Sequence, residues 1–97
     1  MIEITRHKSG ISVKGHANYA EYGRDIVCSA VSVLVQTLIQ SVENLTADKI
    51  TYDMQPGNVN IKLFSLSDQT KVLIDAFFIG IEGISKAYPD NVILKNS

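Results

Sequence analysis

The sequence predicts an α+β fold, a mainly antiparallel sheet with two helices, in the order β-β-α-β-β-α-β. Pairs of short segments with alternating apolar and polar residues are separated by turn residues, and each pair precedes a long segment with apolar residues every three or four positions. Tight turns join antiparallel strands, and amphipathic helices bury their apolar faces against such sheets. Because 97 residues suffice for one core, we expect a single domain over residues 1–97.

The composition excludes several classes of function. The chain has 9 Lys and Arg residues against 10 Asp and Glu, and its basic residues are scattered, which disfavours direct nucleic-acid binding. The N-terminus has no apolar run of signal-peptide length, and the most apolar segment is interrupted by Ser29, Ser32, Gln36 and Thr37, so we expect a cytoplasmic protein without a membrane partner. One cysteine and two histidines at no recognised ligand spacing predict neither a metal site nor a cofactor.

The first hairpin is predicted at the N-terminus. Residues 1–5 and 11–14 alternate between apolar and polar side chains, and Lys8-Ser9-Gly10 between them supplies turn residues. His7 lies beside this turn, where we expect a solvated side chain without a role. The second strand ends at Gly15, where the missing side chain lets another backbone or a ligand approach closely.

A loop and the first helix follow. The segment from Ala17 to Arg24 is polar and rich in tyrosine, and Gly23 permits a positive φ. Asp25 is the predicted N-cap of a helix over residues 26–45, because its carboxylate can accept hydrogen bonds from free N–H groups of the first turn. Val33 lies on the polar face of this helix, and we expect part of that face to meet a partner subunit. The expected apolar face consists of Val27, Val31, Leu34, Val35, Leu38, Ile39, Val42 and Leu45.

The second half of the chain has the same outline. Residues 49–54 and 58–64 form the predicted second hairpin, because the turn at residues 55–58 contains a Pro-Gly pair. The second helix is predicted to begin after the cap Ser67 and to end near Pro89, which cannot continue a helix interior. Its expected apolar residues are Val72, Leu73, Ile74, Phe77, Phe78, Ile81 and Ile84.

Two glycines interrupt this second helix. Gly80 and Gly83 each lower helix stability by about 1 kcal/mol relative to alanine, so we expect them to permit close packing. A last strand over residues 91–95 completes the predicted order.

Cys28 and His16 are the residues that can carry catalysis. Cys28 lies in the first turn of the helix, where free N–H groups and the helix dipole favour thiolate over thiol. His16 follows the second strand and can act as the base if the loop folds back toward the sulfur. The free N–H groups near Cys28 can also hold the oxyanion of a tetrahedral intermediate. A cysteine at the edge of an apolar helical face is, taken alone, more often structural.

These residues belong to a longer pattern, which reads Gly15-His16-Ala17, then Gly23-x-Asp25-Ile26-Val27-Cys28, then Ala30 and Ser32. The pattern resembles that of the ribosomal-processing cysteine protease family, and the length and element order match that family throughout. The resemblance implies a bacterial endopeptidase that removes a short N-terminal extension from large-subunit ribosomal protein twenty-seven, cutting after paired phenylalanines. It also implies a homodimer.

The resemblance assigns roles to six residues of this chain. It implies that Cys28 is the nucleophile and His16 its catalytic partner, without a metal or cofactor. Supporting or structural positions at the site are implied for Gly15, Gly23, Asp25 and Ser32.

Two other functions stay open on the sequence. A ribosome-assembly protein would bind the same ribosomal segment without cutting it, and a buried, inert Cys28 would indicate this function. A thiol redox sensor would need an intermolecular partner, since the chain has no second cysteine.

Two structural questions also stay open. Asp25 caps the helix, orients His16 as the third polar group does in papain-like sites, or does neither. We further expect residues 17–24 to form a mobile lid with Gly23 as its hinge, because this polar loop joins the two candidate catalytic residues.

Overall fold

A computed structural model of the chain describes residues 1–64 and 66–96, and within them it has five strands and two helices. Their order is the predicted one, and their ends differ from the predicted ends by no more than two residues. The elements are β1 (Ile2–His7), β2 (Gly10–Gly15), α1 (Ile26–Leu45), β3 (Ile50–Gln55), β4 (Asn58–Leu63), α2 (Asp68–Ala87) and β5 (Val92–Asn96).

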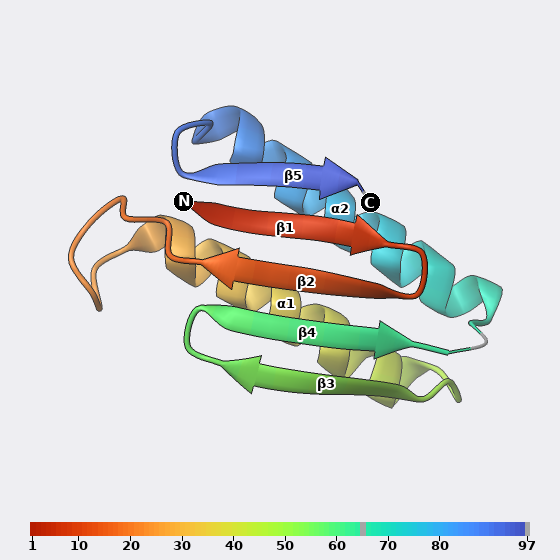
Figure 1. Ribbon diagram of the computed structural model, residues 1–97. Helices are drawn as coiled ribbons and strands as arrows, with labels where there is room; N and C mark the ends of the chain where they lie inside the picture. The colour runs from red at the N-terminus through yellow and green to blue at the C-terminus, as the bar shows by residue number, and fades with distance from the viewer. Residues whose placement is uncertain (65, 97) are drawn as a thin grey trace.

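The strands form one mixed sheet in the order β3-β4-β2-β1-β5 (Figure 1). β1 pairs with β2, β2 with β4 and β4 with β3, all antiparallel, whereas β5 pairs parallel to β1. Both helices lie on the same face of the sheet, so the molecule has two layers (Figure 1). The prediction of an α+β fold with a mainly antiparallel sheet is confirmed.

The core lies between the sheet and the two helices. Alternate strand residues point to the helices, so Ile4 and Ile61 are buried there while Glu3 and Lys62 lie on the open face. The helices contribute valine, leucine, isoleucine and phenylalanine side chains, and Gly80 of α2 lets α1 come close. A Cβ atom at Gly80 would lie 3.0 Å from the Cδ1 atom of Leu34. The predicted role of Gly80 in close packing is therefore confirmed.

A carboxylate joins the two helices at the far end of α1. Asp48 accepts hydrogen bonds from the Ser67 N–H at 2.8 Å, the Ser67 hydroxyl at 2.7 Å and the fully buried Thr70 hydroxyl at 2.5 Å. These hydroxyl and N–H groups lower the pKa of Asp48 from its ordinary value of 3.8. The Ser67 hydroxyl also caps α2 as predicted, since it accepts a hydrogen bond from the Thr70 N–H.

Several expectations about single residues were wrong. Val72 is 66% exposed because it lies on the side of α2 opposite Ile74, and Leu45 is 67% exposed because α1 ends there. A Cβ atom at Gly83 would meet no atom within 4 Å, so this glycine serves no close contact. His7 is exposed but not merely solvated, because its Nε2 atom lies 3.0 Å from the hydroxyl of Ser12.

α1 also has the length and hydropathy of a membrane-spanning helix. In this structure its apolar face packs against the sheet and α2 and supplies much of the core. The core helix of a soluble protein can have the same length and hydropathy as a membrane-spanning helix. The feature is therefore explained by the packing of α1.

Candidate active site

Asp25 organises the start of α1 and the loop before it. Its Oδ1 atom accepts hydrogen bonds from the N–H groups of Val27 and Cys28, both at 3.0 Å, as expected of a helix N-cap. Its Oδ2 atom accepts from the N–H groups of Tyr19 at 2.9 Å and Ala20 at 3.3 Å. The N–H of Cys28, followed by those of Ala20, Tyr19 and Val27, lowers the pKa of this carboxyl from its ordinary value of 3.8.

These contacts answer one question that the sequence left open. All four hydrogen bonds to Asp25 come from backbone N–H groups, and within residues 1–64 and 66–96 no hydrogen bond joins Asp25 to His16. Asp25 therefore caps α1 and fastens the first half of the loop to the helix. The N-cap prediction is confirmed, and the buried carboxylate additionally holds loop residues that the sequence did not connect with it.

The same contacts contradict the expected oxyanion site at the start of α1. The N–H groups of Val27 and Cys28 donate to the Asp25 side chain, and the N–H of Ser29 donates to the Asp25 carbonyl oxygen at 3.1 Å. These donors are not free to bind an oxyanion. The expectation failed because the cap residue satisfies the N–H groups that an uncapped helix leaves open.

Cys28 receives a hydrogen bond from the loop instead. Its side chain is half-buried, and the N–H of Ala17 donates to its Sγ atom at 3.3 Å. Ala17 is buried and directly follows His16, so this bond brings the end of β2 to the first turn of α1. A backbone N–H group at the sulfur stabilises negative charge there.

His16 lies against the turn between β3 and β4. Gly15 donates its N–H to the carbonyl oxygen of Gly57 at 2.9 Å, which holds the end of β2 beside that turn. Gly57 has a φ of 70°, and a Cβ atom there would lie 2.7 Å from the Nε2 atom of His16. Gly15 has a φ of 97°, and a Cβ atom there would collide with the backbone oxygen of Met1. Both glycines are therefore needed for close approach at the site.

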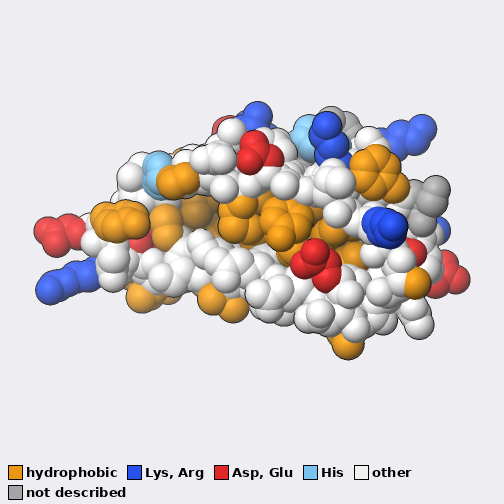
Figure 2. Space-filling view, turned by 90° about the horizontal axis from the view of Figure 1, so that it is seen from below, with side chains coloured by type: hydrophobic (Ala, Val, Ile, Leu, Met, Phe, Trp, Pro, Cys, Tyr) orange, Lys and Arg blue, Asp and Glu red, His pale blue; other side chains and the backbone are white. Residues whose placement is uncertain are grey.

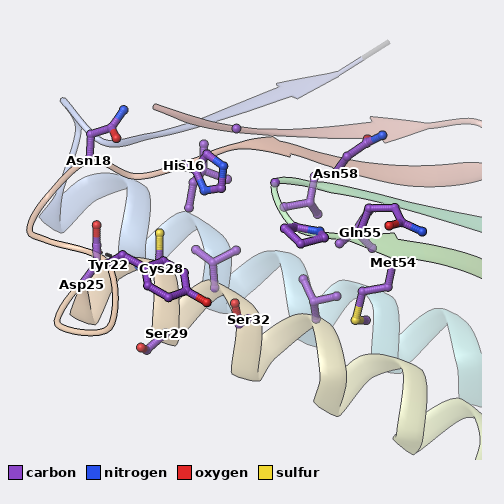
Figure 3. A pocket seen from close by; sticks show the side chains of 18 of the residues that line it. His16, Asn18, Tyr22, Asp25, Cys28, Ser29, Ser32, Met54, Gln55 and Asn58 are labelled. Carbon is purple, nitrogen blue, oxygen red and sulfur yellow. Dashed lines mark hydrogen bonds between the residues drawn. The ribbon is translucent and has the colours of Figure 1, made fainter.

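A cavity of about 860 Å³ connects these parts. Its walls come from the end of β2 and the following loop, the first turns of α1, and the β3–β4 turn. In Figure 3 the Cys28 sulfur points from α1 toward His16 on the opposite wall, Ser32 points into the cavity one turn further along, and the Met54 side chain reaches from β3 toward α1. The six residues to which the resemblance assigned roles all line this cavity, namely Gly15, His16, Gly23, Asp25, Cys28 and Ser32.

The cavity extends as an apolar groove. Seen from the β3 edge, apolar side chains line a hollow between β3 and α1 (Figure 2). At the end near Cys28 the lining includes Val35, Met54 and Val59. An extended peptide laid in this groove would pass Cys28 and His16. Met54 and Gly57 were not recognised from the sequence, where the Pro-Gly pair indicated only a turn.

The loop over the cavity has two unlike halves. Tyr19 and Ala20 are held by Asp25, whereas Tyr22 is fully exposed and Gly23 has a φ of 86° with no atom near its Cβ position. The mobile lid stays a prediction, and these contacts restrict it to the second half of the loop.

In the described part of the chain no three His, Cys, Asp or Glu side chains come together as a metal site would require.

Comparisons with known proteins show the family of the chain. The sequence model of the family described as "Cysteine protease Prp" matches residues 1–93. The "Ribosomal processing cysteine protease Prp" of Bacillus subtilis is 30% identical over 105 aligned residues, which cover 95% of this chain and 94% of that protein. Its Staphylococcus aureus counterpart is 26% identical over 100 residues, covering 96% and 94%.

Solved structures share the fold. SMU.848 from Streptococcus mutans superposes with a TM-score of 0.79 at 30% identity, covering 98% of this chain and 90% of that one. The S. aureus ribosomal processing protease Prp, crystallised with a covalently linked product peptide, superposes with a TM-score of 0.96 at 21% identity over the whole of both chains.

Proposed function

The chain belongs to the cysteine protease Prp family, and on this basis we propose that it removes the short N-terminal extension of large-subunit ribosomal protein twenty-seven with a Cys28–His16 dyad. That it is a ribosomal processing cysteine protease follows from the family and from its relatives. The ribosomal substrate and the dyad are the parts that we propose. We also propose that it acts in the cytoplasm, where ribosomes assemble.

One observation carries the proposal of the dyad. The amide that directly follows His16 donates to the sulfur of Cys28, and both side chains line one cavity (Figure 3). A nucleophilic cysteine needs a base within reach and a donor that stabilises its negative charge. Cys28 is half-buried at the wall of an open cavity, which suits a reactive thiol better than an inert core residue.

The proposed reaction has two steps. In the first, the Cys28 thiolate attacks the carbonyl carbon of the scissile bond, and the protonated His16 gives its proton to the departing amine, which leaves a thioester on Cys28. In the second, His16 takes a proton from a water molecule, whose oxygen attacks the thioester carbon. The carboxylic acid product leaves, and Cys28 is again a thiolate beside the protonated His16. No metal or cofactor takes part in either step.

We propose that the substrate lies extended in the groove between α1 and β3. Large apolar side chains next to the scissile bond would contact Val35, Met54 and Val59, which line the groove near Cys28. The paired phenylalanines implied by the resemblance suit such a lining.

We further propose a homodimer that uses the outer face of α1. Val33 is 61% exposed and Ile26 is also exposed, although both are apolar and lie in the same helix. Exposed apolar side chains on one helix are a feature of subunit interfaces.

The test of the proposed function is mass spectrometry of a peptide that copies the ribosomal extension. The wild type should cut it after the aromatic pair, whereas Cys28→Ala and His16→Ala should lose at least a hundredfold in rate, since each removes a reacting group. Ser29→Ala is the matched control, because this exposed neighbour of Cys28 has no proposed role. An intact peptide that binds the wild type would favour a binding protein, and full activity of Cys28→Ala would exclude Cys28 as the nucleophile.

A further inference from the structure

Asn91 contacts the active-site loop from the far end of the chain. It lies between α2 and β5, and its Nδ2 group donates to the carbonyl oxygen of Ala17 at 2.9 Å, across 74 positions of sequence. The backbone of Asn91 is itself fixed, because its carbonyl oxygen accepts from the Ile2 N–H at 2.8 Å and its N–H donates to the Tyr88 carbonyl at 3.0 Å. The side-chain amide is therefore presented from a rigid position.

Ala17 is the residue whose N–H donates to the Cys28 sulfur at 3.3 Å. The N–H of Ala17 thus donates to the Cys28 sulfur, and the carbonyl oxygen of Ala17 accepts from the Asn91 side-chain amide. Because Ala17 is buried, its carbonyl has no ready supply of water to replace the amide. Loss of the Asn91 donor would let the Ala17 backbone rotate toward another partner and turn its N–H away from the sulfur.

A second contact fastens the same part of the loop. The ring of Tyr19 packs edge-on against the ring of Tyr88, with centroids 5.2 Å apart and planes at 80°. Tyr88 and Asn91 belong to one connection between α2 and β5, so this connection contacts loop residues 17 and 19. Asp25 contacts residues 19 and 20, so the first half of the loop is held both by the start of α1 and by the α2–β5 connection.

We propose that Asn91 is a positioning residue of the active site, which holds Ala17 so that its N–H group points at the Cys28 sulfur and His16 stays beside it. The proposal rests on the proposed function in that Cys28 is the nucleophile. Asn91 touches neither the sulfur nor the substrate in this role. It acts through the backbone of Ala17.

Asn91→Asp tests the proposal, because aspartate has the shape of asparagine but replaces the NH₂ donor by an oxygen that repels the Ala17 carbonyl. The control is Asn44→Asp, which adds the same charge at an exposed position in the last turns of α1, away from the cavity. We expect kcat on the ribosomal peptide to fall about tenfold in Asn91→Asp with KM changed less than about twofold, the effect of one lost hydrogen bond. Asn44→Asp should behave as the wild type.

A second measurement reports the reactivity of the Cys28 sulfur without any substrate. The rate at which iodoacetamide alkylates Cys28 should fall about tenfold at neutral pH in Asn91→Asp, and the pH at which alkylation is half-maximal should rise. A residue with a merely structural role would lower the unfolding midpoint but leave this pH dependence unchanged. Should Asn91→Asp fold poorly, Asn91→Ser withdraws the amide without adding a charge and is judged by the same criteria.

Folded variants of Asn91 with wild-type kcat and wild-type alkylation would overturn the proposal. The two measurements also distinguish a failure of this proposal from a failure of the proposed function. If the wild type does not cut the ribosomal peptide, the proposed function fails, while the alkylation rates still show whether Asn91 positions the amide at the sulfur.

Discussion

Gly57→Ala should lower catalytic activity, because the added methyl group takes space that the His16 ring occupies. A Cβ atom at position 57 would lie 2.7 Å from the His16 Nε2 atom and 3.0 Å from its Cε1 atom. Ordinary contact needs 3.4 Å or more, so the ring must move by at least about 0.7 Å. A displacement of about 1 Å at a catalytic group costs up to a hundredfold in rate, so we expect kcat/KM to fall about 10- to 100-fold.

Stability should change by a separate mechanism. Gly57 has a φ of 70°, and a left-handed conformation costs alanine about 1–2 kcal/mol. Asparagine tolerates this conformation better but has the same Cβ atom. Gly57→Ala and Gly57→Asn should therefore lose similar activity while differing in their free energy of unfolding.

The assay measures kcat/KM on the ribosomal peptide and urea unfolding for both variants. Activity loss in both, with a larger loss of stability in Gly57→Ala, would support the reasoning. Wild-type kcat/KM in a folded Gly57→Ala protein would refute it, because the ring of His16 would then not need its place beside the turn.

Three further predictions concern the rest of the molecule. Gly83→Ala should raise the free energy of unfolding by about 0.8–1 kcal/mol in urea titrations, whereas Gly80→Ala should gain less because its methyl group meets Leu34. The pKa of Asp48 is lowered in the folded state, so the stability that its carboxylate contributes is present above the ordinary pKa of 3.8 and is lost as the pH falls through the lower, folded pKa. Asp48→Asn should therefore make the unfolding temperature less dependent on pH in that range. Val33→Asp should convert the proposed dimer into a monomer in sedimentation velocity, and an unchanged dimer would place the interface elsewhere.

Elements defined by local chemistry were predictable from the sequence. Asp25 and Ser67 cap their helices as expected, and the Pro-Gly pair at residues 56 and 57 forms the expected turn. These signals depend on residues within a few positions of each other. The apolar face of α2 was less predictable, because its apolar residues are too many for periodicity to exclude Val72.

The site was predictable only in part. Cys28 and His16 were predicted as reacting groups because each lies at the end of an element and has a suitable side chain, and both line the cavity. The closeness of Gly57 to His16 depends on the β2–β4 pairing, and the contact of Asn91 with Ala17 depends on the connection into β5, which pairs with β1. Such long-range contacts leave no local pattern in a single sequence.

One failed expectation came from two predictions that exclude each other. Asp25 was predicted as a cap, and the N–H groups of the first turn were predicted as free for an oxyanion. The structure shows that the cap consumes these N–H groups and that Ala17 supplies the donor at the sulfur. A capping side chain satisfies N–H groups that would otherwise be open to an anion.

The most direct test of the Cys28–His16 dyad is the mass of the protein quenched during turnover of the ribosomal peptide. The account predicts an adduct equal to the fragment before the scissile bond less one water, attached to Cys28 in the wild type and nearly absent in His16→Ala. An adduct on another residue, or cleavage by Cys28→Ala at the wild-type rate, would contradict a thioester on Cys28 and with it the proposed mechanism.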